Sequence, residues 1–513
     1  MIKNKIILLI FILFISSFIY FFKLESYPPS VHCDEIYVAE YGHKIISGGL
    51  KNLIGVSWWD IPNAAFFPQG VSSMIIGKRI LTPRLPAPIF SVLTLIVVFF
   101  LVRRIFNTRT AYISIILLST SHWWISISRA GYSNALTALL QVLTYYFIFV
   151  SFDKNKKNFM YPILAGIFLS LGNYIYINFR VVVFIILTVF AHKFLISSDK
   201  EESKLTLIKN VILLFLTAAL FFTPMFLFYF KNPQTILSRT STSFIFSKTI
   251  KEHMYSVYGT YDKKTWLIGN IKKAFDISDK NFDSGLQYGY RGRLLDLITL
   301  VFFIIGLIIS LKNIKQVRYF FLLSWFWLSY LLLAILTEGV IRNYRIIGIY
   351  PVVYIYTALA MDQIIQFLEL KLAKNHLQKN IVYLVFAILI AIIIAINLKI
   401  YFYDNQKNKI YTFTKIPEMK LNDYFQTLDH NNQLVFISQP YIYPNWCLFW
   451  YLTPYLRTYS VNSDQPIPKY SGKLIFIIHK TYQDRLNEII LSYPNGEIIN
   501  NFDDNLIIYK VNN

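Results

Sequence analysis

Two adjacent acids, Asp34 and Glu35, follow the first apolar segment of the chain and open a long polar, aromatic-rich stretch. Carboxylates at the mouth of a membrane protein can accept a proton from an incoming hydroxyl group or hold a cation. Low dielectric near a membrane surface strengthens both effects. The alternative is a pair of ordinary solvated loop acids, and the pair alone predicts both equally well. The other charged residues decide between the two interpretations.

The composition indicates a membrane protein that crosses the bilayer many times. Of 513 residues, 55% are hydrophobic and 15% are charged, and the mean hydropathy is +0.46, unlike a soluble globular chain. A net charge of +22 could suggest nucleic acid, but the basic residues form short clusters between apolar runs, where cytoplasmic loops need them. We expect no nucleic-acid partner. Cys33 and Cys447 form no disulfide framework, and we expect two unpaired thiols rather than one bridge.

About eleven apolar runs approach the roughly 20 residues that a helix needs to cross a bilayer. The first run lacks a small-residue cleavage site, so we expect an uncleaved span rather than a signal peptide. The runs are Ile6 to Phe22, Ala87 to Val102, Thr110 to Ile127, Asn134 to Phe152, Phe159 to Ile177, Val181 to Ile196, Val211 to Phe230, Leu294 to Leu311, Tyr319 to Leu336, Ile346 to Leu368 and Ile381 to Tyr401.

Clusters of Lys and Arg orient these spans. They recur in alternate short loops, which the positive-inside rule places in the cytoplasm together with the amino end. We therefore expect a multi-pass protein of the cell (plasma or inner) membrane, with a transmembrane catalytic domain of the all-α polytopic class at 1–402. Its extracytoplasmic loops are 23–86, which contains interfacial helices, and 231–293.

Residues 403–513 are predicted to form a small extracytoplasmic α/β domain. Three segments have strand-like, β-branched content, and Tyr482 to Ser492 has the pattern of an amphipathic helix. The predicted strands are Leu434 to Ser438, Lys473 to His479 and Leu506 to Val511. No catalytic motif occurs in this part, so we expect it to position an acceptor or to pack against the membrane domain.

Seven arginines lie at or near the predicted outer ends of the spans, in a chain that uses Lys freely elsewhere. Arg presents a planar fork of donors that suits phosphate oxygens, and it stays charged in partly dry surroundings. A ring of arginines around an acid pair predicts a phosphorylated ligand, whereas a single one is explained equally well by contact with lipid headgroups. The seven are Arg84, Arg129, Arg180, Arg291, Arg293, Arg342 and Arg345.

Three strings, together with the acid pair, carry a resemblance to a known family. They are LTPRLPAPIFSVLTLIVVFFLVRRIFNTRTAYISIILLSTSHWWISISRAGYSNAL from Leu81 to Leu136, LAGIFLSLGNYIYINFR from Leu164 to Arg180, and LTEGVIRNYRIIGIYP from Leu336 to Pro351. In order and topology the chain resembles the GT-C superfamily of polyprenyl-phosphate-sugar-dependent glycosyltransferases. Within it, the chain is similar to the protein mannosyltransferase and aminoarabinose transferase-like group, often called family 39.

The resemblance implies a sugar donor on polyprenyl phosphate, a hydroxyl acceptor, transfer outside the cytoplasm, and inversion at the anomeric carbon. It implies Asp34 as the base and Glu35 as a residue that orients the base or ligates a cation. Arg129 matches the family's Ser-Arg position. Tyr176 and Arg180 match the family's Tyr-x-x-x-Arg-like segment. Arg129 and Arg180 are therefore candidates for binding the donor phosphate. Arg342 and Arg345 both correspond to a late arginine of the family.

This sequence departs from the family pattern at two places. Many relatives have a second acid where Asn134 stands here, which weakens a two-carboxylate site for Mg²⁺ or Mn²⁺, although Asp34 and Glu35 suit such a cation. Many relatives also have a His-Pro-Pro segment, and this chain has Phe67-Pro68-Gln69 instead. The sugar, the acceptor class (protein, lipid or glycan) and the metal dependence stay open.

Two other functions are compatible with these observations. A transporter or flippase for a lipid-linked or anionic solute would explain the spans and arginines, but it predicts charges in helix middles and two related halves. A ligase-type membrane transferase would use Arg and His without the acid pair. Replacement of Asp34 discriminates among the three.

Overall fold

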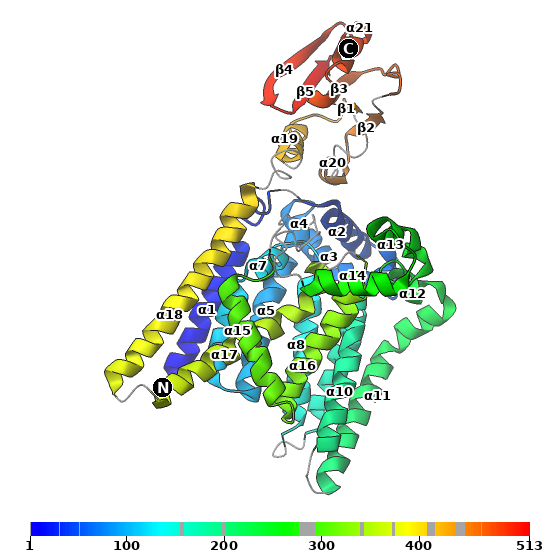
Figure 1. The fold of residues 1–513 in the computed structure, drawn as a ribbon. Helices are drawn as coiled ribbons and strands as arrows, with labels where there is room; N and C mark the ends of the chain where they lie inside the picture. Colours follow the sequence, from blue (N-terminus) through cyan, green and yellow to red (C-terminus); the bar gives the residue numbers. More distant parts are fainter. Residues whose placement is uncertain are drawn as a thin grey trace.

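The computed structural model describes residues 2–29, 31–50, 52–153, 158–196, 201–275, 293–338, 343–371, 375–407, 416–437, 447–462 and 464–512. Long apolar helices form a bundle, and shorter helices and a five-stranded sheet lie at one end of it (Figure 1). The amino terminus lies at the opposite end of the bundle.

Helical segments lie at every predicted span. They are α1 (Ile2–Phe21), α5 (Pro86–Ile105), α6 (Thr108–Thr120), α7 (His122–Ser128), α8 (Asn134–Ser151), α9 (Met160–Asn173), α10 (Val181–Ile196), α11 (Glu201–Lys231), α15 (Leu297–Lys312), α16 (Val317–Tyr330), α17 (Tyr350–Lys371) and α18 (His376–Lys399). Among the described residues, seven helices are long and apolar enough to cross a membrane, and Lys5–Phe21, Met160–Asn173 and Leu297–Lys312 are apolar but shorter. The number of crossing helices stays a prediction.

The third predicted span, Thr110 to Ile127, differs from the expectation because it contains a break. α6 ends at Thr120 and α7 begins at His122, and Ser121 between them has extended backbone angles. The backbone N–H of His122 donates to the side-chain oxygen of Asn397 at 3.1 Å. Hydropathy does not register this break, because a single extended residue leaves the apolar run intact.

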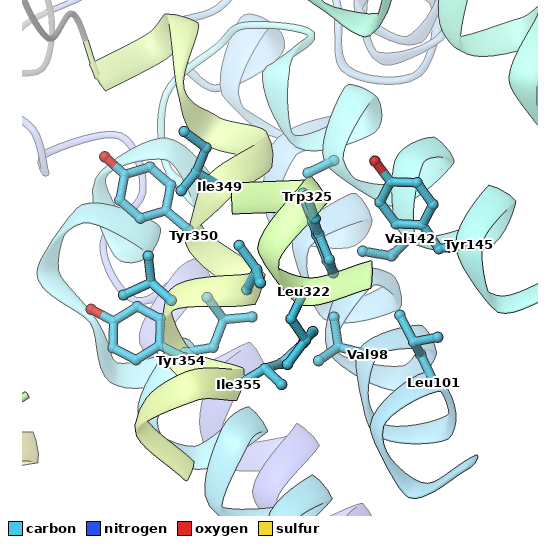
Figure 2. Packing of buried hydrophobic residues seen from close by; sticks show 14 of the residues in the cluster. Val98, Leu101, Val142, Tyr145, Leu322, Trp325, Ile349, Tyr350, Tyr354 and Ile355 are labelled. Carbon is cyan, nitrogen blue, oxygen red and sulfur yellow. The ribbon is translucent and has the colours of Figure 1, made fainter. Parts of the chain in front are cut away.

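Branched and aromatic side chains from α5, α8, α16 and α17 fill the centre of the bundle (Figure 2). The rings of Tyr145 and Trp325 meet at 4.8 Å between centroids, and the indole N–H of Trp325 donates to the carbonyl of Gly348 at 2.7 Å. Elsewhere a Cβ on Gly306 would lie 2.1 Å from the carbonyl oxygen of Tyr356. α15 and α17 therefore approach each other more closely than a larger residue permits.

Short helices from two separate parts of the chain gather at the sheet end of the bundle (Figure 1). The first group is α2 (Cys33–Ile46), α3 (Phe67–Ile76) and α4 (Leu81–Arg84), and the second is α12 (Gln234–Ser241), α13 (Lys251–Tyr258) and α14 (Lys263–Phe275). These segments come from the two loops predicted to lie outside the cytoplasm. The side of the membrane that this end faces stays a prediction.

The carboxy-terminal part contains a mixed sheet with the order β2-β1-β3-β5-β4. β1 (Asn432–Ile437) is parallel to β2 (Arg457–Val461) and β3 (Lys473–His479), whereas β5 (Leu506–Val511) is antiparallel to β3 and β4 (Gly496–Asp503). The helices are α19 (Ile416–Phe425), α20 (Cys447–Leu452) and α21 (Arg485–Ser492). The three predicted strands correspond to β1, β3 and β5. β2 and β4 are edge strands, whose polar residues hide the alternation that identifies a strand.

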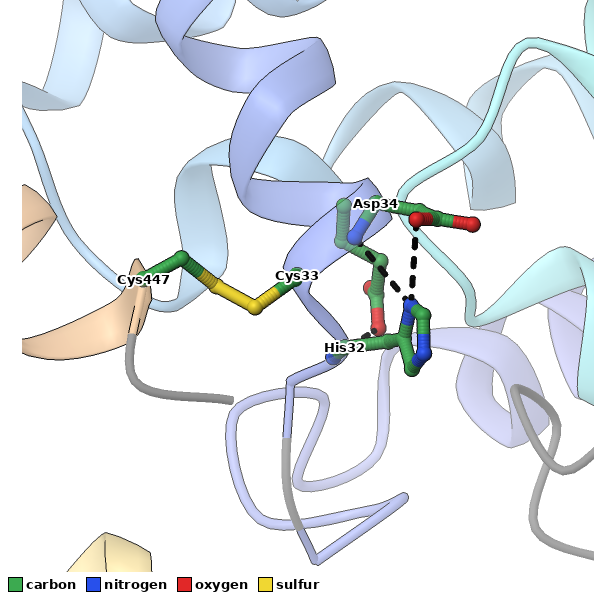
Figure 3. The surroundings of a disulfide bond; sticks show 5 residues. His32, Cys33, Asp34 and Cys447 are labelled. Atoms are coloured by element: carbon green, nitrogen blue, oxygen red, sulfur yellow. Dashed lines mark hydrogen bonds and ion pairs between the residues drawn. A yellow bond between two sulfur atoms is a disulfide. The ribbon is translucent and has the colours of Figure 1, made fainter. Parts of the chain in front are cut away.

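The expectation of two unpaired thiols is wrong, because Cys33 and Cys447 form a disulfide with a Cα–Cα distance of 5.6 Å. They are the first residues of α2 and α20 and are 414 residues apart in the chain. Apolar side chains that include Ile36 and Tyr451 pack around them. Cysteine counting predicts frameworks in small domains, and a single long-range bridge depends on the tertiary fold. Figure 3 shows the disulfide at the start of α2, with the Asp34 side chain directed away from it toward the ring of His32.

Candidate active site

A cavity of about 360 Å³ has residues of α2 and α12 in its lining, and both helices belong to the groups at the sheet end of the bundle. It is lined by residues from α2, from the segment before α3, from the turn before α8, from the segment before α10, from α12, and from the connection between α16 and α17. The lining residues are Asp34, Val38, Trp58, Trp59, Ile61, Phe66, Tyr132, Ser133, Asn134, Tyr176, Arg239, Thr242, Ser243, Glu338, Tyr344 and Arg345.

Asp34 lies in the first turn of α2 and is partly exposed to this cavity. The ring Nδ1 of His32 caps the helix by accepting from the backbone N–H of Asp34 at 3.1 Å, and it lies 3.5 Å from the Asp34 carboxylate. A helix N-terminus favours negative charge. Gly42 and Gly70 let α2 and α3 touch, since a Cβ on Gly42 would lie 2.5 Å from the Gly70 nitrogen. The capped helix holds the carboxylate at the cavity wall.

Glu35 points away from the cavity into a buried polar cluster. One carboxylate oxygen accepts from the backbone N–H of Gly131 at 2.7 Å and from the Arg84 guanidinium at 3.3 Å. The other accepts from the backbone N–H of His32 at 3.2 Å, which completes a capping box. A Cβ on Gly131 would lie 2.9 Å from the Glu35 carboxylate. Position 131 therefore requires glycine for this close approach.

Arg84 and Arg129 are fully buried, and their guanidinium groups bind backbone carbonyls around the connection between α1 and α2. Arg84 donates to Leu24, Glu25 and Pro28 at 3.0 to 3.2 Å. Arg129 donates to five carbonyls, those of Ile19, Tyr20, Phe22, Lys23 and Tyr27, at 2.6 to 3.3 Å. Cations at a helix C-terminus satisfy its last carbonyls. Arg129 therefore caps α1, and neither arginine lines the cavity.

Arg239 of α12 enters the cavity beside two aromatic residues. Its guanidinium lies 5.2 Å above the ring of Trp59, and Tyr176 lines the same cavity. Burial raises the pKa of Tyr176 to about 12, although Arg239 and Arg345 act in the opposite direction. The phenol therefore keeps its proton at neutral pH and can donate to a ligand. No carboxylate of the described residues forms an ion pair with Arg239.

Backbone strain occurs next to Arg239. Trp59 and Asp60 both have φ of 54°, in the left-handed region that favours glycine. Such conformations cost free energy, about 1–3 kcal/mol each, and they cluster at binding and active sites. Trp59, whose ring lies beneath the Arg239 guanidinium, is one of these two residues.

Arg345 occupies a second position in the cavity and is engaged by an acid. Its two terminal nitrogens donate to the backbone carbonyl and to the carboxylate of Glu338, both at 2.7 Å. The surrounding backbone is braced, because Asn134 donates to the carbonyl of Tyr344 at 2.7 Å and Asn178 donates to the carbonyl of Arg345 at 2.9 Å. The structure therefore presents Arg345 as one half of a nearly buried ion pair.

The structure brings together four of the residues predicted from the sequence: Asp34, Asn134, Tyr176 and Arg345. Glu35, Arg84, Arg129, Arg180 and Arg293 are not among the lining residues. Arg180 donates to the carbonyl of Ile236 at 3.0 Å, and the carbonyl of Arg293 accepts from His122 and Trp123. Arg291 and Arg342 lie outside the described residues.

Sequence reasoning missed Arg239 and Glu338. Arg239 carried a usable signal, because it is the one arginine in 231–275, where every other Lys or Arg position is a lysine, but it does not adjoin a predicted span. Glu338 lies in the quoted string from Leu336 to Pro351, yet a single acid in a connection gives no indication of its partner. The segment after α12, the helix that carries Arg239, pairs with the segment that contains Glu338. The N–H of Glu338 donates to the carbonyl of Ser243 at 2.7 Å, and Phe244 forms a β-bridge with Thr337.

The donor set of the described residues does not fit a cage for a divalent cation. Such a cation requires several oxygen ligands, but Glu35 is bound to Arg84 and backbone N–H groups, and Glu338 is bound to Arg345. Within the described part of the chain, no group of three His, Cys, Asp or Glu side chains is placed to hold a metal ion.

The arrangement suits an anionic ligand with an apolar or ring-shaped part. Two guanidinium groups and the Tyr176 hydroxyl can donate to phosphate oxygens, and the rings of Trp58, Trp59 and Phe66 offer apolar surface. Asp34 supplies a carboxylate that can accept a proton from a hydroxyl group in the same cavity.

Residues 60–228 match the family model of the dolichyl-phosphate-mannose-protein mannosyltransferases, so the predicted resemblance is confirmed. None of the curated proteins compared with the chain matches it significantly. Among solved structures, the chain is similar to ArnT from Cupriavidus metallidurans bound to undecaprenyl phosphate, with a TM-score of 0.58 at 10% identity over 99% of this chain and 97% of that chain.

The archaeal oligosaccharyltransferase AglB from Archaeoglobus fulgidus, in complex with an inhibitory peptide and a dolichol-phosphate, has a TM-score of 0.55 at 13% identity, over 88% of this chain and 64% of that chain. The Archaeoglobus fulgidus oligosaccharyltransferase complex with Zn and sulfate has a TM-score of 0.54 at 14% identity, over 87% of this chain and 62% of that chain. The chain spans less than two thirds of those longer proteins. The predicted GT-C fold with a small carboxy-terminal sheet region is confirmed.

Proposed function

We propose that this chain, which has the fold of the GT-C glycosyltransferases, transfers a sugar from a polyprenyl-phosphate donor to a hydroxyl acceptor. One observation carries the proposal: a single cavity is lined by the acid Asp34 and by the guanidinium groups of Arg239 and Arg345, which come from distant parts of the chain. The cavity belongs to residues 1–402, the catalytic domain, and opens at the extracytoplasmic end of the bundle. Residues 403–513 form a second domain beside it.

The reaction is a single displacement at the anomeric carbon. The acceptor oxygen forms a bond to that carbon as its proton passes to the Asp34 carboxylate. The bond between the anomeric carbon and the phosphate oxygen breaks, and its electron pair leaves with polyprenyl phosphate. One displacement, with one base and no covalent intermediate, inverts the anomeric configuration.

Arg239 binds the donor phosphate. A phosphodiester carries one negative charge, and Arg239 is the lining guanidinium that no described carboxylate neutralises. The Tyr176 hydroxyl adds a neutral donor beside it, and the sugar ring packs on the neighbouring indole rings. Positive charge next to the departing oxygen stabilises the charge that develops there.

The solved structures support the class of donor lipid. The ArnT and AglB structures have undecaprenyl phosphate and a dolichol-phosphate bound, both polyprenyl-type monophosphates. We extend that class to this chain because its cavity combines phosphate donors with a carboxylate. The transporter alternative explains the arginines but leaves the capped position of Asp34 without a role.

The test supplies the purified full-length protein with a panel of radiolabelled polyprenyl-phosphate sugars and follows label that leaves the lipid. The Asp34→Asn variant is expected to lower the transfer rate by about 10²–10⁴-fold, the contribution of a positioned base. Glu40→Gln is the matched control, since Glu40 is an acid of the same helix that pairs with Lys44 and Lys78 outside the cavity lining.

Folding of the variants is checked by size-exclusion chromatography and thermal unfolding. Normal transfer by Asp34→Asn would show that this carboxylate is not the base. Release of no label from any donor by the unmodified protein would argue against glycosyl transfer and favour the transporter alternative.

A further inference from the structure

The cavity contains a second acid that the proposed mechanism leaves unused. Glu338 and Arg345 form an ion pair whose side chains are 9% and 6% exposed, and both face the cavity. The fork of Arg345 is occupied, because one nitrogen donates to the Glu338 carboxylate and the other to the Glu338 backbone carbonyl. In this state the second guanidinium of the site is neutralised by the protein itself.

The two arginines of the cavity are therefore not equivalent toward an anion. Arg239 lies over the uncharged ring of Trp59, whereas Arg345 already binds a carboxylate. An arriving phosphodiester with one negative charge meets one guanidinium whose charge is uncompensated by described residues. A phosphate with a second negative charge can pair that charge with Arg345 only if it displaces the Glu338 carboxylate.

The charge of the phosphate increases during the proposed reaction. The donor is a phosphodiester with one negative charge, and the product is a phosphate monoester with about −1.5 to −2 charges at pH 7. Building on the proposed function, we propose that Glu338 is an exchangeable counter-ion: it holds Arg345 while the donor binds and yields it to the phosphate as the bond to the sugar breaks. Afterwards Glu338 competes with the product for Arg345 and promotes its release.

The surroundings of Glu338 allow this exchange without a movement of the backbone. Its N–H donates to the carbonyl of Ser243 at 2.7 Å, which holds the main chain in place. Its second carboxylate oxygen lies 3.4 Å from Nε2 of His253, a half-exposed residue of α13. If the Glu338 side chain rotates away from Arg345, it can keep the His253 contact, so the displaced carboxylate is not left alone in a partly dry cavity.

Removal of the Glu338 charge leaves Arg345 available to the product at all times. The Glu338→Gln variant keeps an amide oxygen for Arg345 and is therefore expected to fold. Hydrogen bonds to charged groups are worth enough to shift affinity by about 10- to 100-fold. We expect Glu338→Gln to bind a polyprenyl monophosphate more tightly by that factor, to bind a phosphodiester nearly as before, and to show stronger product inhibition.

The experiment measures dissociation constants of the detergent-solubilised full-length protein for farnesyl phosphate, a short polyprenyl monophosphate, and for its methyl ester, a phosphodiester. Unmodified protein, Glu338→Gln, His253→Ala and Glu40→Gln are compared by titration calorimetry. His253→Ala removes the second partner of Glu338 at a half-exposed position and is expected to weaken monophosphate binding while diester binding persists. Glu40→Gln is expected to match the unmodified protein.

The outcomes separate the two proposals. Failure of the unmodified protein to bind either probe would contradict the proposed function. If it binds both and Glu338→Gln has unchanged or weaker affinity for the monophosphate, Glu338 merely supports the position of Arg345 and the exchange is refuted. If Glu338→Gln fails to fold, unchanged monophosphate affinity in His253→Ala refutes it instead.

Discussion

The two adjacent acids of the first loop lie in opposite environments. Asp34 faces a cavity with two guanidinium groups in its lining, whereas Glu35 is 1% exposed and binds Arg84 and Gly131 behind the same helix turn. Neighbouring residues at the start of a helix point in different directions, so one can face a ligand while the next anchors the helix. The comparison shows that a buried scaffold and an open site can share a single motif.

The arginines divide in the same way. The guanidinium groups of Arg84 and Arg129 donate hydrogen bonds to backbone carbonyls, and both residues are fully buried. Arg239 and Arg345 instead face the cavity. Both settings favour arginine over lysine, because a planar fork satisfies several acceptors at once. Residue type alone therefore does not separate a structural arginine from a ligand-binding one.

The largest effect on stability is expected when the buried ion pair of Arg84 and Glu35 is broken. Arg84→Met leaves the Glu35 carboxylate buried without its cation, which costs about 3–5 kcal/mol of stability. The measurement is the unfolding temperature in detergent, followed by tryptophan fluorescence, with the yield of monodisperse protein as a second readout. The double variant Arg84→Met with Glu35→Gln removes both charges and is expected to recover part of the loss. An unaltered unfolding temperature in Arg84→Met would contradict the scaffold role.

A smaller effect, confined to the ligand, is expected from Arg239→Lys. Lysine keeps the charge but loses the fork and its stacking on Trp59, so the KM for a polyprenyl-phosphate sugar is expected to rise by about 10- to 100-fold. Steady-state kinetics measure it, and the unfolding temperature serves as the control. A loss of stability with an unchanged KM would place Arg239 with the buried arginines instead.

The smallest effect is expected from Arg180→Lys, although the family resemblance implied a role in binding the donor phosphate. The guanidinium of Arg180 donates to a backbone carbonyl of α12, and Arg180 is not a lining residue of the cavity. Stability is expected to change by about 0.5 kcal/mol or less, and the donor KM by less than about two-fold. A rise in KM as large as that of Arg239→Lys would support the phosphate role implied by the resemblance.

Four residues of the cavity lining were named from residue types and their place in the motifs. Asp34, Asn134, Tyr176 and Arg345 were expected at one site, and all four line the cavity. The prediction that Arg129 binds the donor phosphate stays untested, but its five backbone contacts satisfy a helix end, which no sequence pattern displays. Arg239 was omitted because it does not adjoin a predicted span, and its place at the cavity depends on how the distant segments fold together.

The sequence by itself determined the class of the molecule: apolar runs of bilayer length require helices, because a backbone in lipid must satisfy its own hydrogen bonds. The basic clusters predict the orientation of these helices. It also determined that an acid opens the first loop. Only the tertiary structure decided which acid faces the cavity, which arginines bind carbonyls, and that Cys33 pairs with Cys447. Those outcomes depend on contacts between segments hundreds of residues apart, and local pattern carries no information about such distances.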